Sequence, residues 1–249
     1  EYVYREIKGD ILLSSISGGT DILGCLAVGS PLLPVYAGEL QTRSLGLAVA
    51  VFNDKGEEVI GEKGELVCKA PFPSQPVGFV NDPDNSKYKK AYFEKFKGIW
   101  CHGDYVLLNE RGSMIFYGRS DATLNPGGIR IGTAEIYSAV ESIPEVLECV
   151  AIGQNWGDDV RVVLFVVTNE KLTAELKSKI SSTIREKCSP FHVPKKIIQV
   201  PEIPRTRSGK IVELAIRSVV HGEEVKNVEA ILNPETLVHF KDIKELKDE

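Results

Sequence analysis

A lysine at the end of a short basic loop is the residue of this chain best suited to chemistry. The loop reads Arg205-Thr206-Arg207-Ser208-Gly209-Lys210, and its Ser-Gly pair favours a tight exposed turn. A lysine ammonium placed there is a mobile charge that can stabilise negative charge developing in a transition state. Pro204 and Ile211 occupy positions where an NTPase phosphate loop requires a glycine and a hydroxyl residue, so that interpretation fails. A solvated basic loop is the alternative.

A second candidate segment, Ser17-Gly18-Gly19-Thr20-Asp21, combines small residues with a hydroxyl and a carboxylate. Glycines allow the backbone to approach a ligand closely, and oxygen side chains suit a phosphate and its magnesium ion. A polar turn capped by threonine and aspartate is the alternative interpretation.

Two further segments carry polar groups at turns or strand ends. Asp104 follows Gly103 at the start of an expected strand, where a carboxylate can accept hydrogen bonds from the two ribose hydroxyls of a nucleotide. The segment Pro126-Gly127-Gly128-Ile129-Arg130 is rich in glycine, but a hairpin turn explains this pattern more often than a phosphate cradle does. An ordinary surface aspartate is the alternative for Asp104.

The elements that must position these residues change character along the chain. Up to about residue 118 the pattern predicts mainly strands, at Leu33–Tyr36, Leu45–Phe52 and Glu65–Lys69. We expect one helix at about 83–96. A hairpin is expected around Glu110-Arg111-Gly112, where the glycine would supply a positive φ.

The second half of the chain alternates helices with strands. A helix is expected from Thr133, followed by strands at Val146–Ile152 and Val160–Thr168. Apolar residues then recur every four positions from Leu172 to Cys188, which predicts a helix with one buried stripe. Asn233-Pro234 supplies an N-cap and a first-turn proline for a last short helix.

Composition excludes several classes of protein. The 249 residues carry a net charge of −5 with no lysine-rich block, which argues against nucleic acid or an anionic membrane as the main partner. The longest apolar run, Leu45–Phe52, is far shorter than the roughly 20 residues that span a bilayer. Five scattered cysteines without a Cys-x-x-Cys pair favour reduced thiols in a cytosolic protein. The start at Glu1 has no signal-peptide pattern, and we expect a piece of a longer protein.

Five motifs in a fixed order resemble the adenylate-forming acid–CoA ligases. They are Ser17–Ile22, Gly64–Val67, Trp100–Asp104, Gly118–Arg130 and Pro204–Lys210. Within this superfamily, the tail Asn233-Pro234-Glu235-Thr236-Leu237 and the Ser-Gly-Gly-Thr-Asp form of the first motif are similar to the members that activate acetoacetate.

The resemblance implies an α+β protein in two parts. Residues 1–118 would form the β-rich C-terminal part of the adenylation (AMP-binding) core domain. Residues 119–249 would form the small mobile α+β lid domain. Asp121 corresponds to the hinge residue, whose backbone torsions change when the lid turns, although an aspartate in an ordinary turn would give the same local sequence.

The resemblance also assigns a nucleotide site. Gly19 and Thr20 would meet the phosphates of ATP, and Asp21 would carry the Mg²⁺ ion. The family usually has a glutamate at the position of Asp21 and an aromatic residue ahead of the glycine, where this chain has Ile16-Ser17. The aromatic stack on adenine is therefore not expected here.

Further contacts follow from the same resemblance. Asp104 and Arg119 would hold the ribose, and Arg130 would meet a phosphate. Gly128 would let the pantetheine of CoA pass close to the backbone. Arg185 aligns less securely with a residue that meets the nucleotide phosphate of CoA, and a solvated helix arginine explains it equally well.

The reaction implied has two steps. A carboxylic acid, acetoacetate in first place, attacks the α-phosphorus of Mg-ATP to give an acyl-adenylate and pyrophosphate, and the CoA thiol then displaces AMP. Lys210 would act in the first step and be withdrawn in the second. An acetyl- or propionyl-CoA synthetase, or a catalytically silent nucleotide- or partner-binding piece, are the alternatives. We expect residues 1–249 to be incomplete as an enzyme by themselves.

Overall fold

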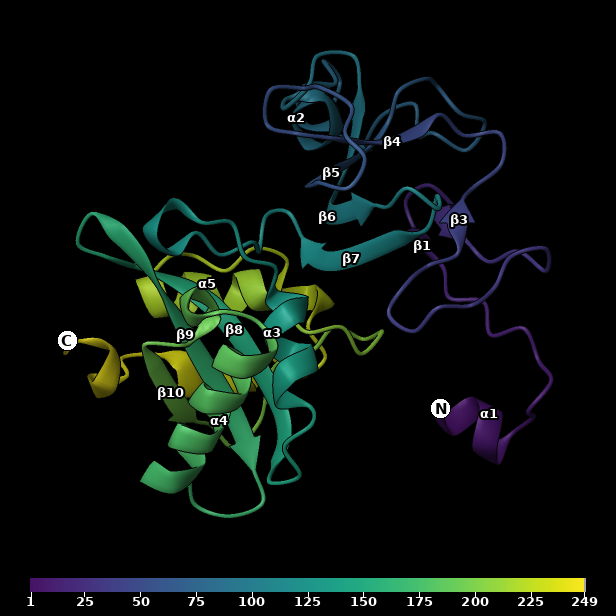
Figure 1. Ribbon diagram of the computed structural model, residues 1–249. Helices are drawn as coiled ribbons and strands as arrows, with labels where there is room; N and C mark the ends of the chain where they lie inside the picture. Colours follow the sequence, from purple (N-terminus) through teal and green to yellow (C-terminus); the bar gives the residue numbers. More distant parts are fainter. Residues whose placement is uncertain (249) are drawn as a thin grey trace. The chain divides into compact units, whose positions relative to one another are not determined.

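The computed structural model of the protein describes residues 1–248, and the chain divides into two compact units, Glu1–Ser120 and Asp121–Glu249. In Figure 1 the first unit runs from purple to teal and the second from teal through green to yellow. Both units contain helices and sheets, which confirms the expected α+β class. Among the described residues, no helix is long and apolar enough to cross a membrane.

The first unit contains two antiparallel sheets. A three-stranded sheet has the order β1-β2-β3, with β1 at Ser17–Gly19, β2 at Gly24–Val28 and β3 at Thr42–Arg43. A four-stranded sheet has the order β4-β5-β6-β7, with strands Val49–Phe52, Lys63–Cys68, Trp100–Leu108 and Met114–Arg119. The two helices are α1 at Tyr2–Glu6 and α2 at Ser86–Phe93. The expected hairpin is confirmed as β6–β7, with φ of +87° at Gly112.

An aromatic cluster packs α2 against β6. Tyr88 and Tyr92 lie on one face of the short helix because residues four apart are neighbours on a helix surface, and Phe93 ends the helix next to Tyr92. All three contact Trp100, whose ring is 1% exposed, and Tyr92 stacks on it with the ring centroids 3.7 Å apart. This cluster fixes one end of β6, the strand that carries Asp104. The expectation that Asp104 begins a strand was wrong, because β6 already starts at Trp100 and continues through Gly103 to Leu108.

Two strand predictions in the first unit were wrong in whole or in part. Leu33–Tyr36 forms no strand, because Pro34 has no N–H for a ladder and the buried Gln41 side chain donates instead to the carbonyl of Leu33 at 2.7 Å. Only the last four residues of Leu45–Phe52 form a strand, since Gly46 has φ of +80°. The helix expected at 83–96 is confirmed but shorter.

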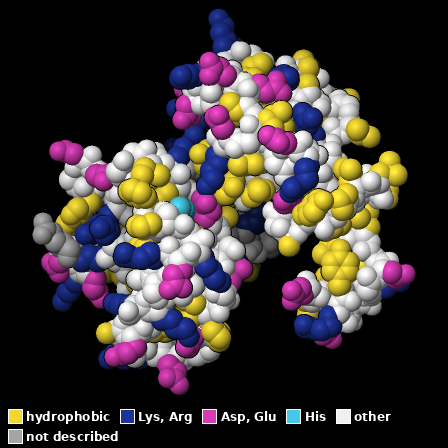
Figure 2. Space-filling model, viewed as in Figure 1, with side chains coloured by type: hydrophobic (Ala, Val, Ile, Leu, Met, Phe, Trp, Pro, Cys, Tyr) yellow, Lys and Arg dark blue, Asp and Glu magenta, His cyan; other side chains and the backbone are white. Residues whose placement is uncertain are grey.

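Exposed apolar side chains are frequent on the first unit. Figure 2 shows hydrophobic side chains at its surface, and the most exposed are Leu23, Leu32, Leu45, Val77 and Val80, each at least 88% exposed. Such surface is typical of a region that meets another part of a protein.

The second unit is built on one three-stranded sheet, ordered β10-β9-β8. The hairpin β8–β9 is antiparallel and β10 pairs parallel to β9. In chain order the elements are η1 Pro126–Gly128, α3 Thr133–Val140, β8 Val146–Trp156, β9 Asp159–Thr168, α4 Ala174–Lys187, η2 Pro190–His192, β10 Lys196–Gln199, α5 Glu213–His221, η3 Val228–Ala230, η4 Pro234–Phe240 and η5 Lys244–Leu246, where η denotes a 3₁₀ helix.

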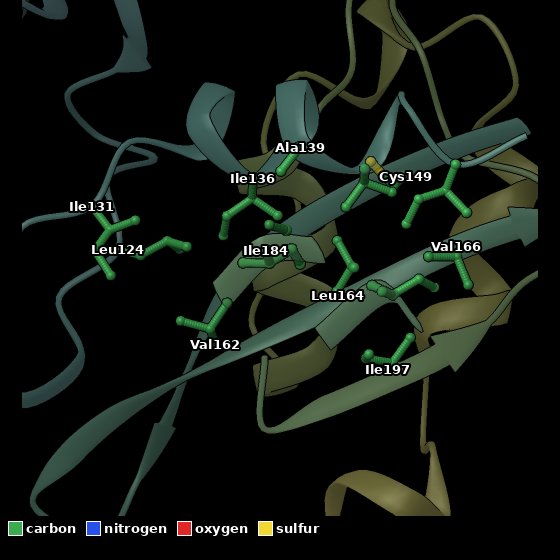
Figure 3. Close-up of a cluster of buried hydrophobic side chains, with 14 residues drawn as sticks. Leu124, Ile131, Ile136, Ala139, Cys149, Val162, Leu164, Val166, Ile184 and Ile197 are labelled. Atoms are coloured by element: carbon green, nitrogen blue, oxygen red, sulfur yellow. The ribbon is translucent and has the colours of Figure 1, made fainter. Parts of the chain in front are cut away.

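Strand β9 is buried on both faces because successive side chains point to opposite sides of a sheet. Val162, Leu164 and Val166 pack in one core with α3 and α4, the cluster drawn in Figure 3. Val163 and Phe165 pack in a second core with α5 and η4. The sheet is therefore the middle layer of three.

The helical stripe predicted from Leu172 to Cys188 is confirmed, since its apolar residues pack in the first core and Thr173 caps α4 by accepting from the Leu176 N–H at 3.2 Å. The helix expected from Thr133 is confirmed as α3, but Thr133 is its first residue and not the N-cap that its hydroxyl would suit: Gly132 precedes α3, and its N–H donates to Glu135 Oε2 at 3.1 Å. Asn233 precedes a 3₁₀ helix but makes no side-chain cap, and its side chain bonds elsewhere.

Removing Phe240 tests the second core. Its ring is 0% exposed and packs edge-on against Phe165 at 4.9 Å between centroids. We expect Phe240→Ala to lower the free energy of unfolding by about 3–5 kcal/mol through lost burial and a residual cavity. Val238→Ala, on the same 3₁₀ helix but 64% exposed, should change it by less than about 0.5 kcal/mol. Urea denaturation followed by circular dichroism measures both, and equal effects would contradict this account of the core.

Candidate functional site

In the first unit, a cross-strand pair carries two of the predicted nucleotide contacts. Asp104 on β6 and Arg119 on β7 are directly opposite each other, with Arg119 Nη1 3.7 Å from Asp104 Oδ1. Arg119 also donates to the carbonyl of His102 at 3.1 Å. Gly103 between them has φ of +83°, and a Cβ there would lie 2.5 Å from Arg119 Nη2. The positive φ favours glycine at this position, and the missing Cβ leaves the space that the Arg119 guanidinium occupies.

A tyrosine that the sequence analysis missed holds Asp21. Tyr92 Oη donates to Asp21 Oδ2 at 2.6 Å, while the tyrosine ring is fixed by its stack on Trp100. Burial, followed by the neighbouring carboxylate, raises the pKa of the Tyr92 hydroxyl well above its usual range. The hydroxyl therefore stays protonated and orients the carboxylate. Only the helical spacing of Tyr88 and Tyr92 hinted at this aromatic face.

Buried His102 joins the two pairs into one cluster. Its Nδ1 accepts from Trp100 Nε1 at 3.4 Å, and its Nε2 lies 3.8 Å from Asp104 Oδ2. A Cβ at Gly19 would lie 3.1 Å from His102 Cε1 and would overlap the Asp21 carboxylate. The structure thus brings Gly19, Asp21, Asp104 and Arg119 together, all within the first unit, with Thr20 exposed beside Asp21.

The Lys210 loop of the second unit is a tight turn, as expected. Thr206 N–H donates to the carbonyl of Lys210 and Gly209 N–H to that of Thr206, both at 2.8 Å. The Lys210 N–H donates to Thr206 Oγ1 at 3.1 Å, and Gly209 has φ of +82°. Lys210 is exposed at the end of this turn. A lysine so placed presents a positive charge on an ordered backbone.

The glycine segment 126–130 is a turn as well. Gly127 and Gly128 have φ of +58° and +76°, and Leu124 and Ile131 pair across the base of the turn. The Gly127 N–H donates to both carboxylate oxygens of Asp159, at 2.9 and 3.0 Å. Asp159 begins β9, and the sequence analysis gave no signal for it because the contact spans 32 residues.

A pocket of about 510 Å³ lies beside this turn. Its wall includes Trp156, Arg161 and Phe191, with Arg161 Cζ 3.5 Å from the centroid of the Trp156 ring and Phe191 53% exposed. Lys195 and Lys196 complete its basic side. Aromatic faces with basic groups suit a flat ring that carries an anionic group.

The other predicted residues of the second unit are dispersed. Arg185 is exposed in the last turn of α4 and does not line this pocket. Arg130 is half-buried after the glycine turn. Asp121 is exposed at the first position of the unit.

A half-buried carboxyl group, Glu213, was also missed by the sequence analysis. It accepts from Tyr137 Oη at 3.0 Å and from Thr133 Oγ1 at 3.4 Å, and it lines a cavity of about 130 Å³ with Ala122 and Thr123. Burial raises its pKa above the usual value, and the charge of Asp121 adds a smaller contribution in the same direction. The first residues of the second unit therefore lie in the field of this glutamate.

Comparison with known proteins shows what the chain is similar to. Residues 135–210 match the AMP-binding enzyme C-terminal domain. The chain shares its fold with a solved anthranilate CoA ligase, AuaEII, in complex with anthranoyl-AMP, with a TM-score of 0.72 at 23% identity over 87% of this chain and 41% of that one. These matches confirm the resemblance to adenylate-forming enzymes.

Within this class the chain is similar to acetoacetyl-CoA synthetases. It is 58% identical to the acetoacetyl-coenzyme A synthetase of Rhizobium meliloti over 99% of this chain, and 47% identical to that of Xenopus tropicalis over 100%. The solved acetoacetyl-CoA synthetase from Streptomyces lividans matches with a TM-score of 0.87 and 39% identity, over 94% of this chain and 36% of that one. The chain spans about 38% of the length of both curated relatives.

Replacing Glu213 tests whether burial of its carboxyl group makes the charged form unfavourable. A carboxyl group whose folded-state pKa is raised stabilises the fold fully below its unfolded pKa, near 4.5, and this stability is lost as the pH rises through the folded pKa. We expect Glu213→Gln, which cannot ionise, to unfold at a higher temperature than the parent at about pH 8, with the difference shrinking toward about pH 4. Glu235→Gln, an exposed control, should show no such trend in thermal melts. A lower melting temperature for Glu213→Gln at pH 8 would contradict the proposed cost of the buried charge.

Proposed function

We propose that the chain forms part of an ATP-dependent acid–CoA ligase that converts acetoacetate, ATP and CoA to acetoacetyl-CoA, AMP and pyrophosphate through an acyl-adenylate. The 58% identity to an acetoacetyl-coenzyme A synthetase over 99% of this chain is the observation that carries this proposal. The cluster of the first unit and the ordered lysine loop of the second support it, since adenylation requires groups that bind a nucleotide and neutralise phosphate charge.

The first-unit cluster would bind the nucleotide. The Asp104 carboxylate would accept from the ribose hydroxyls, with Arg119 beside it. Gly19 and Thr20 would approach the phosphates. The absence of a Cβ at Gly19 lets the Asp21 carboxylate and the His102 ring pack close to this backbone.

Asp21 would hold Mg²⁺. Its carboxylate is an oxygen ligand of the kind that Mg²⁺ prefers, and Tyr92 orients it. Within residues 1–248, no cluster of three or more His, Cys, Asp or Glu side chains forms a metal site. Asp21 would therefore share the ion with phosphate oxygens and water, which is usual for Mg²⁺ bound with a nucleotide. The ion would neutralise phosphate charge.

The second unit would supply the charge for adenylation and the contacts for CoA. Lys210 would stabilise charge at the carboxylate and α-phosphate in the first step, and Arg130 would meet a phosphate. Rotation about Asp121 would then bring the Gly128 turn into use for the pantetheine. The aromatic and basic pocket beside this turn would bind the adenine and a phosphate of CoA. Arg185 does not line this pocket, so we do not assign the phosphate contact to it.

The test of the function is acid-dependent pyrophosphate release by the full-length protein, with acetoacetate, acetate and propionate in parallel. Preference for acetoacetate supports the proposal. Preference for acetate or propionate would assign the chain to another short-chain ligase. No release with any acid would leave a nucleotide- or partner-binding role.

Lys210→Ala should slow adenylate formation by about a hundredfold, roughly 3 kcal/mol, because a positioned charge is lost from the transition state. Thioester formation from supplied acyl-adenylate should stay nearly intact. Single-turnover assays of each half-reaction measure both rates, with Lys226→Ala as an exposed control in the same unit. Equal losses in the two half-reactions would refute the role of Lys210.

Asp104→Ala should weaken ATP binding by about 1.5–3 kcal/mol through lost charge-assisted hydrogen bonds. Affinity for the carboxylic acid should change little. Calorimetry on the full-length protein measures both, and Asp10→Ala, at an exposed position of the same unit, is the control. Unchanged nucleotide affinity would leave Asp104 as a residue in the middle of β6 that only pairs with Arg119.

A further inference from the structure

The Lys210 loop is backed by a segment that lies outside residues 135–210, the part matched to the AMP-binding enzyme C-terminal domain. Residues 230–233 run beside residues 205–207. Leu232 N–H donates to the carbonyl of Arg205 at 2.7 Å, Arg207 N–H donates to that of Ala230 at 3.3 Å, and Thr206 pairs with Ile231. The tail thus pairs, through one isolated antiparallel bridge and two flanking hydrogen bonds, with the segment that enters the loop.

The side chain of Asn233 completes this contact. Its Oδ1 accepts from the Arg205 N–H at 2.9 Å, and its Nδ2 donates to Glu202 Oε1 at 2.7 Å and, more weakly, to the carbonyl of Ile203 at 3.4 Å. On its other side, Thr236 Oγ1 donates to the Asn233 carbonyl at 2.7 Å. Both polar atoms of the amide are therefore used on residues that precede the lysine turn.

Arg205 connects the tail to the lysine turn by hydrogen bonds. Its N–H and C=O are bonded to the tail, as described above, while its Nη1 donates to the carbonyl of Gly209 at 2.8 Å, next to Lys210. Its Nη2 donates to Glu148 Oε2 on β8 at 2.7 Å. A continuous chain of hydrogen bonds therefore runs from Asn233 through Arg205 to the residue before the lysine.

We propose that Asn233 is a positioning residue for Lys210, which fixes the backbone of its loop so that the ammonium reaches the reacting phosphate; this proposal rests on the proposed ligase function. Lys210 is exposed, and a lysine side chain has a flexible four-carbon stem. The position of the loop backbone therefore limits where the Lys210 ammonium can lie. A misplacement of about 1 Å can cost up to about a hundredfold in rate.

The chemistry of the position requires an amide. Arg205 N–H needs an acceptor and Glu202 needs a donor, and asparagine offers both within one short side chain. Aspartate at position 233 would keep the acceptor for Arg205, but its negative charge would repel the Glu202 carboxylate. Alanine would lose both contacts. A paired change, Asn233→Asp with Glu202→Gln, would restore a donor and an acceptor with their places exchanged.

Half-reaction kinetics on the full-length protein test the proposal. Asn233→Ala should slow adenylation by about tenfold or more, the loss expected for one to two hydrogen bonds that hold a reacting group. Thioester formation from supplied acyl-adenylate should stay within about twofold of the parent rate. Asn233→Asp/Glu202→Gln should recover most of the adenylation rate, and Asn169→Ala, an exposed asparagine of the same unit, should match the parent.

Hydrogen exchange monitored by mass spectrometry gives a readout independent of activity. Peptides that cover residues 204–210 should exchange faster in Asn233→Ala, while peptides of β9 stay protected. Unchanged adenylation, equal slowing of both half-reactions, or unchanged exchange at 204–210 would each overturn the proposal. A parent protein that activates none of the three acids would refute the ligase function, and the exchange result would then still decide whether Asn233 holds the loop.

Discussion

Burial of strand β9 on both faces is the constraint on which the second unit depends. The face with Val162 and Leu164 supports α3 and α4, and the face with Val163 and Phe165 supports α5 and η4. Because alternate side chains of one strand belong to two cores, a register shift of one residue would move each set to the wrong core. The hairpin register of β8 and β9 is therefore fixed by two sets of contacts at once.

Each face of this sheet supports one of the two candidate loops, the glycine turn and the Lys210 loop. On one side, Leu124 and Ile131 are buried in the first core and close the base of the glycine turn. On the other side, Phe240 is buried in the second core and anchors η4, the helix that follows Asn233. The tips of the loops are exposed, so their conformations come from hydrogen bonds, which include side-chain bonds from Asp159 and Asn233, and not from burial.

In the first unit, an aromatic stack holds segments together that are far apart in the sequence. Trp100 is packed by α2 and lies two residues before His102 and four before Asp104 on the same strand. Tyr92, on the other face of that stack, reaches Asp21 from a helix about seventy residues further along the chain. One apolar contact thus fixes two carboxylates that no local sequence pattern connects.

The sequence predicted the features that depend on local chemistry. The tight turn at Lys210, the hairpin at Gly112 and the stripe of α4 follow from glycine conformation and helical period, which act over a few residues. The strand expected at Leu33–Tyr36 is absent because Pro34 lacks a ladder N–H and the nearby Gln41 side chain donates to the Leu33 carbonyl, two effects that the apolar pattern does not show. Tyr92, Asp159 and Glu213 were missed because each acts through a contact across at least 32 residues, a distance over which periodicity carries no information.

Asn233 illustrates how a correct local rule can lead to the wrong role. An asparagine before a proline is a good helix start by propensity, and a helix does begin at Pro234. The amide is used instead by Arg205 because that N–H would otherwise lack a partner beside the lysine turn. An unpaired backbone donor in this half-buried segment costs more than a helix end that water can reach. The Asn233 amide can cap the helix at Pro234 or accept from the Arg205 N–H, and the cost of desolvating that N–H favours the second. This choice connects the tail to the loop that carries Lys210.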